Sequence, residues 1–280
     1  MSGVAELLVA LLLFQRSRHS AIFWFATMML TSAIWAIFYS FELSSHTLDQ
    51  MLFWINLEYI GISFLPATWI MFILHFIGKS GWLSKRNILI IFSFPLLAVA
   101  FVWTNSWHHV HYETVSLSTT GPFPLLAITP GPWYHVHVAY FYFLLALGAI
   151  LLGRHYAKSE LVYRKQIRII LAGALIPWIT NFIYLIGFRP YQHIDLTPYA
   201  FILSSLVTAY GLFQYQLFSI LPFAKDKLID TIVEGMLVVD SNGKIIHLNR
   251  TMQNFLVGPD KIIGKSFNKL FPSHYSLHQL

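Results

Sequence analysis

Histidine and carboxylate side chains gather in the polar stretch between two long apolar segments and at the start of the second of these segments. The group consists of His108, His109, His111, Glu113, His135 and His137. Neutral imidazoles beside a carboxylate suit zinc or copper, and the stretch contains no Lys or Arg that would repel a cation. We consider His108, His109, His111 and His135 as candidates for metal binding or for proton sensing near pH 6.5. The alternative is that these histidines only form hydrogen bonds.

A second candidate site is centred on Glu58, a carboxylate inside an apolar segment. Ionisable residues within membrane segments usually face the bundle interior or a cavity. We predict a ligand or proton pocket formed by Glu42, Asn56, Glu58, Asn105, Trp133, His137, Asn181, Tyr184 and Asp195. The alternative is structural: Glu58 pairs with a neighbouring helix, and Asn181 caps the backbone freed by Pro177.

The composition shows what kind of element must position these residues. Of the 280 residues, 56% are hydrophobic and only 11% are charged, whereas soluble domains carry about 25% charged residues. A single soluble core cannot absorb so much apolar surface, which indicates a membrane protein. The absence of cysteine excludes disulfides, thiolate metal sites and thiol nucleophiles.

Seven apolar segments are candidates for crossing a bilayer, which takes about 20 residues of helix. Six have this length, at residues 21–41, 52–77, 87–103, 133–153, 167–188 and 196–218. The seventh, residues 3–14, is short and contains Glu6, so that it either begins upstream of Met1 or does not fully span. The expected fold over residues 1–220 is an all-α polytopic bundle of seven transmembrane helices.

The distribution of Lys and Arg predicts the orientation of this bundle. Basic residues follow the first, third, fifth and seventh segments, whereas the intervening loops contain only Arg189. Because basic loops stay on the cytoplasmic side, we expect a multi-pass protein of the cell membrane with its N-terminus outside and its C-terminus in the cytoplasm. The net charge of +6 then reflects basic loops on the cytoplasmic side of the lipid bilayer, which is the expected partner. We expect no nucleic-acid partner.

The chain becomes ordinarily polar after the last apolar segment. We predict a linker helix over residues 221–234. Residues 235–240 and 244–249 are typical of two strands, because aliphatic runs flank the turn sequence Ser241-Asn242-Gly243. A helix over residues 250–256 is expected to follow.

The membrane part carries an ordered series of motifs: Trp35 to Glu42, Tyr59-Ile60-Gly61, Pro66-Ala67-Thr68-Trp69, Thr104-Asn105, His108-His109, Gly131-Pro132-Trp133, Tyr163-Arg164, Leu175-Ile176-Pro177-Trp178 and Asp195-Leu196-Thr197-Pro198. This series resembles the family called the histidine kinase N-terminal seven-transmembrane region. The family occurs at the input end of bacterial sensor kinases and of some diguanylate cyclases.

Residues 235–280 resemble the first half of an α/β PAS domain, with an aliphatic strand ending in Asp240 and an Ile-rich strand ending in Asn249. Leu280 falls before the remaining three strands of such a domain. The phosphorylatable dimerisation helix, the ATP-binding domain and the cyclase domain of the family are missing from the sequence. As given, the chain is not expected to be an enzyme, and we predict no cofactor.

The two resemblances together imply a sensory input module of a two-component receptor. They imply a homodimer, a small-molecule or ionic signal, and either a cytoplasmic output domain or a response regulator as partner. We expect Pro177, Pro222 and Glu234 to take part in signal relay. Three alternatives remain: the input module of a diguanylate cyclase, a small-solute transporter or channel with a regulatory tail, and a truncated product without signalling of its own.

Several other functions do not fit the sequence. A retinal protein needs a Lys in its last helix, and residues 196–218 contain none. A secondary transporter is expected to show two related halves with paired broken helices, and the unmatched prolines do not show this. An intramembrane hydrolase needs clustered His, Asp or Ser at helical spacing, and a phosphate site needs a Gly-rich loop; neither pattern occurs.

Overall fold

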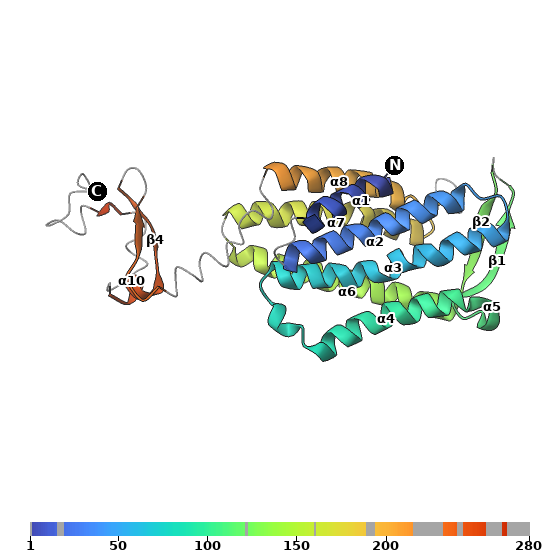
Figure 1. The fold of residues 1–280 in the computed structure, drawn as a ribbon, viewed down its shortest axis with the longest axis horizontal. Coiled ribbons are helices and arrows are strands. Elements are labelled where there is room, and N and C mark those ends of the chain that lie inside the picture. Colours follow the sequence, from blue (N-terminus) through green and yellow to red (C-terminus); the bar gives the residue numbers. More distant parts are fainter. Residues whose placement is uncertain are drawn as a thin grey trace. The chain divides into compact units, whose positions relative to one another are not determined.

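The computed structural model describes residues 2–15, 20–120, 123–159, 161–188, 194–214, 232–239, 243–255 and 265–267. The chain forms two compact units, residues 1–217 and 218–280. The first is a bundle of helices with a small β-hairpin, and the second is a short α/β segment (Figure 1).

Each apolar segment predicted from the sequence forms a helix. The long helices of the first unit are α1 (Ser2–Gln15), α2 (Ser20–Leu43), α3 (Leu48–Phe76), α4 (Lys85–Trp103), α6 (Pro132–Lys158), α7 (Leu161–Leu185) and α8 (Thr197–Gln214). Within the described residues, α2, α3, α4, α6 and residues 163–185 of α7 are long and apolar enough to cross a membrane, whereas α1 and residues 197–208 of α8 are shorter apolar helices. The structure thus gives five spans by length and composition, fewer than the seven predicted.

Polar residues mark where the helices begin. The Thr47 hydroxyl accepts a hydrogen bond from the backbone of Gln50 (3.4 Å) at the start of α3. Ser84 does the same for Asn87 (3.2 Å) at the start of α4, just after the short helix η1 (Ser80–Trp82). These caps satisfy backbone donors that have no partner within the helix.

Helix α3 is the central element of the bundle and packs against α2, α4 and α6. In its most apolar stretch 78% of the residues are buried, against 17% for α4 at the edge of the bundle (Figure 1). The Trp69 indole donates a hydrogen bond to the Leu145 carbonyl of α6 (3.3 Å) and packs edge-on against Trp178 of α7, 4.8 Å between ring centres. Trp69 therefore joins three helices.

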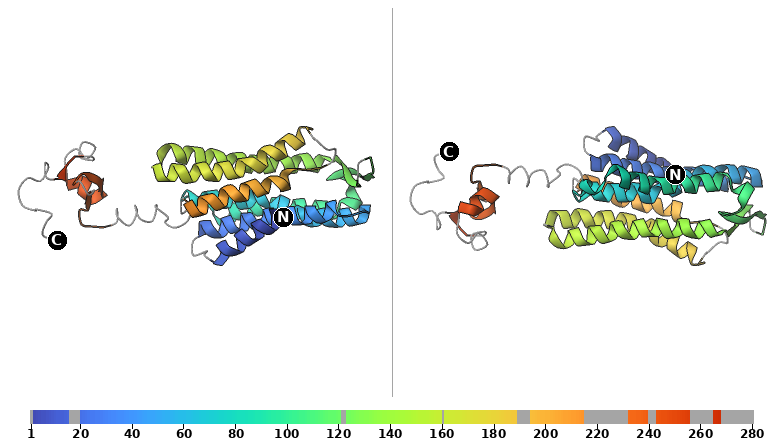
Figure 2. Two further views of the ribbon diagram at one scale, coloured as in Figure 1. Left: turned by 90° about the horizontal axis from the view of Figure 1, so that it is seen from above. Right: turned by 90° about the horizontal axis from the view of Figure 1, so that it is seen from below.

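Helix α8, the last of the bundle, lies against α7, α1 and α2 (Figure 2). Ser205 of α8 donates a hydrogen bond to Glu6 Oε1 of α1 (3.3 Å), deep between the helices. Phe201 packs edge-on against Trp35 of α2 at 5.4 Å. Helix α1 is short, but it is therefore an integral part of the bundle core.

A β-hairpin occupies much of the stretch between α4 and α6, which was expected to be a loop. Strand β1 (Tyr112–Ser118) pairs antiparallel with β2 (Leu125–Pro130), after the short helix α5 (Asn105–His108). Alternating apolar and hydroxyl side chains around Val115, at residues 114–118, are the sequence signal for β1.

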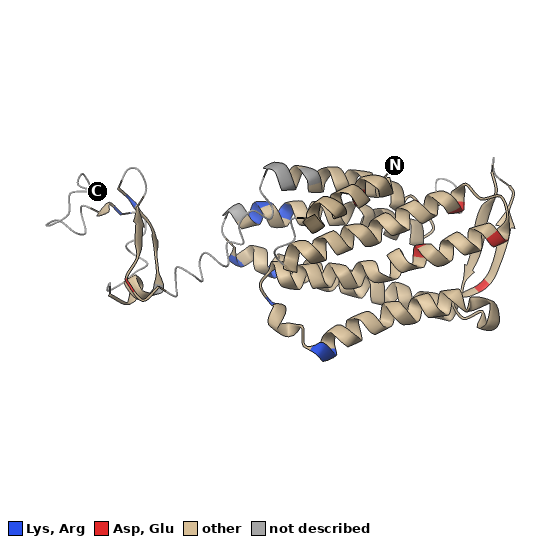
Figure 3. Ribbon diagram, viewed as in Figure 1, with Lys and Arg blue, Asp and Glu red and all other residues tan. Residues whose placement is uncertain are grey.

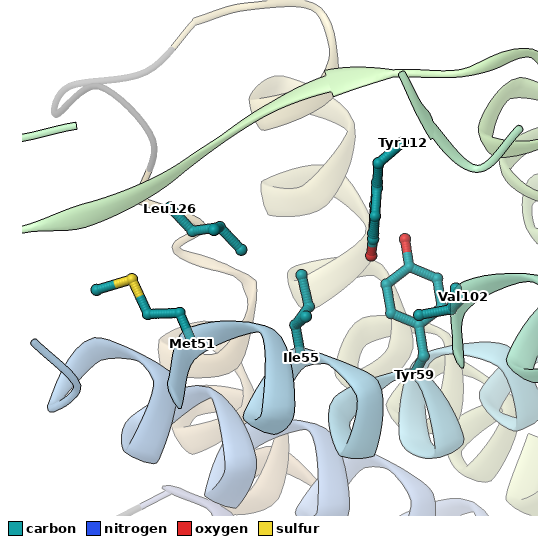
Figure 4. Close-up of a cluster of buried hydrophobic side chains, with 6 residues drawn as sticks. All are labelled: Met51, Ile55, Tyr59, Val102, Tyr112 and Leu126. Carbon is teal, nitrogen blue, oxygen red and sulfur yellow. The ribbon is translucent and has the colours of Figure 1, made fainter. Parts of the chain in front are cut away.

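The hairpin packs on the ends of α3 and α4. Figure 4 shows the contact, a buried cluster of Met51, Ile55, Tyr59, Val102, Tyr112 and Leu126. Three elements that are distant in the sequence meet here. The hairpin thus covers one end of the bundle.

Charged residues are separated along the bundle (Figure 3). Among the described residues, Lys and Arg gather at the end opposite the hairpin, and the visible Asp and Glu lie toward the hairpin. This separation gives the bundle a basic end and an acidic end. Charged side chains are costly in the membrane core, so charges at the two ends are compatible with a bundle that crosses a membrane.

The second unit contains the predicted hairpin. Strand β3 (Leu237–Val239) pairs antiparallel with β4 (Ile245–Leu248), and α10 (Arg250–Phe255) follows. Asn249 organises the unit: its side chain accepts hydrogen bonds from the backbone of Met236 (2.8 Å) and Met252 (2.9 Å) and donates one to the Glu234 carbonyl (2.8 Å). Pro222 and most of the predicted linker helix lie outside the described residues.

Candidate ligand pocket

A cavity of about 150 Å³ lies inside the first unit near the hairpin. Residues of α2, α3, α6, α7, the hairpin and the segment just before α8 surround it. The lining consists of Trp35, Tyr39, Glu42, Ile55, Glu58, Tyr59, Ile62, Tyr112, Leu126, Ile128, Pro130, Tyr134, His137, Val138, Phe141, Tyr142, Asn181, Tyr184, Leu185 and Asp195. The fold thus brings together Glu42, Glu58, His137, Asn181, Tyr184 and Asp195, as the sequence predicts.

Two carboxyl groups meet at the centre of this site. Glu42 of α2 and Glu58 of α3 are both buried, and both side chains line the cavity. Glu58 Oε1 is buried without a hydrogen-bond partner. One oxygen of Glu58 therefore remains available.

Asp195 connects the pocket to the first turn of α8. Its Oδ1 accepts hydrogen bonds from the Thr197 backbone (2.8 Å) and the Thr197 hydroxyl (2.6 Å). The Asp195 backbone donates to the Tyr39 hydroxyl of α2 (2.7 Å). The carboxylate thus caps α8, where the helix dipole favours negative charge, and faces the pocket at the same time.

Asn181 connects three helices in the same region. Its Oδ1 accepts a hydrogen bond from Tyr142 of α6 (2.8 Å), and its Nδ2 donates to the Thr197 hydroxyl (3.2 Å). The Asn181 side chain therefore binds neighbouring side chains at the pocket. Together with Asp195, it ties the start of α8 to the pocket wall.

His137 and Tyr59 form another wall of the pocket. His137 is 3% exposed, packs against Tyr59 at 5.7 Å, and has an Nε2 without a hydrogen-bond partner. The Tyr59 hydroxyl and His111 Nε2 are hydrogen-bonded at 2.9 Å. Buried polar atoms are nearly always paired in folded proteins, so the bare Nε2 marks a position suited to a ligand.

Two of the predicted pocket residues have a different role. Trp133 packs against Phe94 and Phe101 with ring centres 5.3 and 4.5 Å apart, away from the cavity. Asn56 does not line the cavity either. Its backbone carbonyl accepts a hydrogen bond from the Trp103 indole (2.7 Å). Their inclusion in the predicted pocket is wrong, because hydropathy gives depth in the membrane but not the direction that a side chain faces.

Asn105 is also outside the pocket and instead holds the hairpin. Its Oδ1 accepts hydrogen bonds from the backbone of His111 (3.0 Å) and Tyr112 (2.9 Å), and its Nδ2 donates to the Tyr112 carbonyl (3.0 Å). Asn105 therefore satisfies backbone groups that enter β1. Its predicted role as a ligand contact is wrong.

The predicted histidine metal site does not form. No three His, Asp or Glu side chains among the described residues lie together in a way that could hold a metal ion. His108 bonds locally to Thr104 (3.1 Å) and to the Val110 backbone (3.0 Å), while His109 and His135 are exposed. The four histidines therefore have different surroundings and do not form one site.

His111 does not have the ordinary pKa that proton sensing requires. Burial, aided by nearby His137 and His108, lowers the pKa of His111 from 6.5 to about 3. In the unfolded chain the imidazole gains a proton below its usual pKa, whereas in the fold it stays neutral until about pH 3. The predicted sensing by His111 around pH 6.5 is therefore wrong.

This lowered pKa predicts how stability depends on pH. Between the two pKa values the unfolded state binds more protons, so His111 makes the fold less stable as the pH falls, by up to ~1.4 kcal/mol per pH unit. We expect His111→Asn to flatten the decline in unfolding free energy measured from pH 7 to pH 5. If the unfolding free energy of the variant and of the natural chain falls equally steeply with pH, the lowered pKa of His111 is contradicted.

Most aromatic residues of the lining are absent from the predicted pocket, although the sequence contains a signal for them. Tyr134, His137 and Phe141 follow the i, i+3, i+7 spacing of one helix face. Trp35, Tyr39 and Glu42 follow the equivalent i, i+4, i+7 spacing on α2. Such spacing alone is equally typical of helix packing. Only the cavity distinguishes the two roles.

The long apolar helices and their separated charges define a multi-pass membrane protein. Residues 1–222 match the family described as the N-terminal 7TM region of histidine kinase, and the chain belongs to this family. The family implies a membrane sensory input module of histidine kinases. The resemblance found in the sequence motifs is thereby confirmed for the membrane part. No curated protein matches the chain.

Proposed function

We propose that the chain receives a chemical signal in the pocket near the hairpin and passes it to α8. The observation that carries this proposal is the double role of Asp195 and Asn181, which line the pocket and bond to Thr197 at the start of α8. Among the described helices of the first unit, α8 is the last in the sequence. A ligand that changes these contacts therefore acts on the described helix that precedes the second unit in the sequence.

Signal transfer requires two arrangements of the bundle that bind the ligand differently. A ligand that draws Asp195 or Asn181 toward it weakens the bonds to Thr197 and favours a second position of α8. Pro177, inside α7, and Glu234, whose carbonyl binds Asn249, are the described relay candidates. Pro222 belongs to the same proposal.

The proposal includes an orientation. All seven long helices cross the bilayer, the acidic end with the hairpin lies outside, and the basic end lies in the cytoplasm, as basic loops favour. Residues 235–280 form the start of a PAS-type domain. The receptor is a homodimer that acts on a cytoplasmic output domain or a response regulator.

A covalent occupant of the pocket tests the relay without a known ligand. Val138 of α6 lines the pocket, and the chain contains no cysteine, so that Val138→Cys provides a unique thiol. We expect its reaction with methyl methanethiosulfonate to change amide hydrogen exchange in α8 by about fivefold or more, the lower range of coupling between sites. The measurement is made on the full chain in lipid nanodiscs.

Val136→Cys is the matched control, because Val136 lies on the same helix but is 46% exposed and outside the pocket. Its modification is expected to leave exchange in α8 unchanged. Unchanged exchange in α8 after complete modification of Val138→Cys would refute the relay.

A further inference from the structure

We infer that the pocket binds a small primary or secondary ammonium ion. The inference rests on the proposed function and names the class of signal for the same site. The juxtaposition that carries it is a set of carboxyl groups from α2, α3 and the α8 cap inside an aromatic enclosure. The charge, the unpaired polar atoms and the aromatic walls of the cavity each exclude some classes of ligand.

The charge of the lining selects a cation. Three carboxyl groups, those of Glu42, Glu58 and Asp195, line the cavity, and its lining contains no Lys or Arg. A buried anion would have no positive partner here, and burying an unpaired charge is costly.

The unpaired polar atoms select a hydrogen-bond donor. Glu58 Oε1 and His137 Nε2 are both buried without partners, on side chains that are 2% and 3% exposed. Glu58 Oε1 can only accept a hydrogen bond, and Nε2 accepts one in one tautomer of His137. A primary or secondary ammonium ion carries N–H groups for both positions, whereas a quaternary ammonium ion carries none.

The walls select an organic ion over a metal ion. The cavity is lined by aromatic rings, among them Trp35, Tyr59 and Phe141, and such rings attract organic cations through their faces. A cavity of about 150 Å³ has room for a molecule of about the size of benzene. No group of three His, Asp or Glu among the described residues is arranged to coordinate a metal ion.

Three compounds with the same ring and different charge test the inference. We expect cyclohexylamine to bind the full chain in nanodiscs, measured by calorimetry with empty nanodiscs subtracted, at least about tenfold more tightly than neutral cyclohexanol. Cyclohexanecarboxylate is expected not to bind. Equal affinity for all three compounds, or no binding of the amine, would overturn the inference.

Two variants locate the binding. Glu58→Gln keeps the shape of the side chain and is expected to lower the affinity for cyclohexylamine at least about tenfold. Asp49→Asn makes the same charge change on the same helix, but Asp49 is outside the cavity. It is expected to leave the affinity unchanged. Equal affinities for Glu58→Gln and the natural chain would place the amine elsewhere.

A second measurement keeps every carboxyl group intact. At Val138→Cys, the cationic reagent 2-aminoethyl methanethiosulfonate is expected to react faster than the anionic 2-sulfonatoethyl reagent. The ratio of the two rates is expected to be much larger than at Val136→Cys, outside the pocket. Equal ratios at both positions would show that the pocket does not select cations and would overturn the inference.

The two experiments separate this inference from the proposed function. If methyl methanethiosulfonate on Val138→Cys alters α8 but cyclohexylamine does not bind, the relay stands and the ammonium class is wrong. If cyclohexylamine binds through Glu58 but leaves exchange in α8 unchanged, the class is right and the relay is wrong.

Discussion

Gly61→Ala is expected to destabilise the helical bundle by about 2 kcal/mol or more. A Cβ at position 61 would collide with the backbone carbonyl of Thr31 and lie 2.6 Å from the Trp35 backbone nitrogen on α2. Backbone atoms within a helix cannot turn aside as a flexible side chain can. The change therefore forces α2 and α3 apart where their backbones approach closely.

The measurement is the unfolding free energy of the purified chain in detergent, compared with Gly153→Ala. A Cβ added to Gly153 of α6 would have no neighbouring atom within 4 Å. Alanine is expected to be neutral or slightly stabilising there, because it favours a helix by about 1 kcal/mol over glycine. Similar stabilities for the two variants would contradict the close approach of α2 to α3.

Asn105→Ala is expected to release the β-hairpin from the bundle. The substitution leaves the backbone donors of His111 and Tyr112 without their acceptor and removes the donor to the Tyr112 carbonyl. Each buried group left unpaired costs about 1–3 kcal/mol, so we expect a loss of about 3 kcal/mol in local stability. The hairpin forms part of the pocket wall, so ligand binding is expected to weaken as well.

Amide hydrogen exchange of β1 and β2 measures this release. Asn105→Asp keeps an acceptor for both backbone donors and is expected to lose less protection than Asn105→Ala. Asn56→Ala is the control, because the hydrogen bond at Asn56 involves its backbone carbonyl and not its side chain. Equal protection in Asn105→Ala and the natural chain would show that Asn105 is not the anchor.

The sequence determines the helices because their signal is local. Runs of apolar residues give the positions of α2, α3 and α4 to within a few residues, and a Gly turn between aliphatic runs gives the β3–β4 hairpin. The ionisable residue in an apolar segment, Glu58, also identifies the centre of the candidate site. Each of these inferences needs only neighbouring residues, because hydropathy and turn formation depend on a short stretch of chain.

Tertiary structure decides which residues share the pocket. Asn105, Asn56 and Asn181 are all amides near helix ends, yet only Asn181 lines the cavity. The rotation of each helix about its axis selects among them, and that rotation depends on close contacts such as Gly61 against α2. Packing between distant segments sets these contacts. The sequence by itself therefore determines that this is a membrane bundle with a buried acid, and only the packed fold determines what that acid faces.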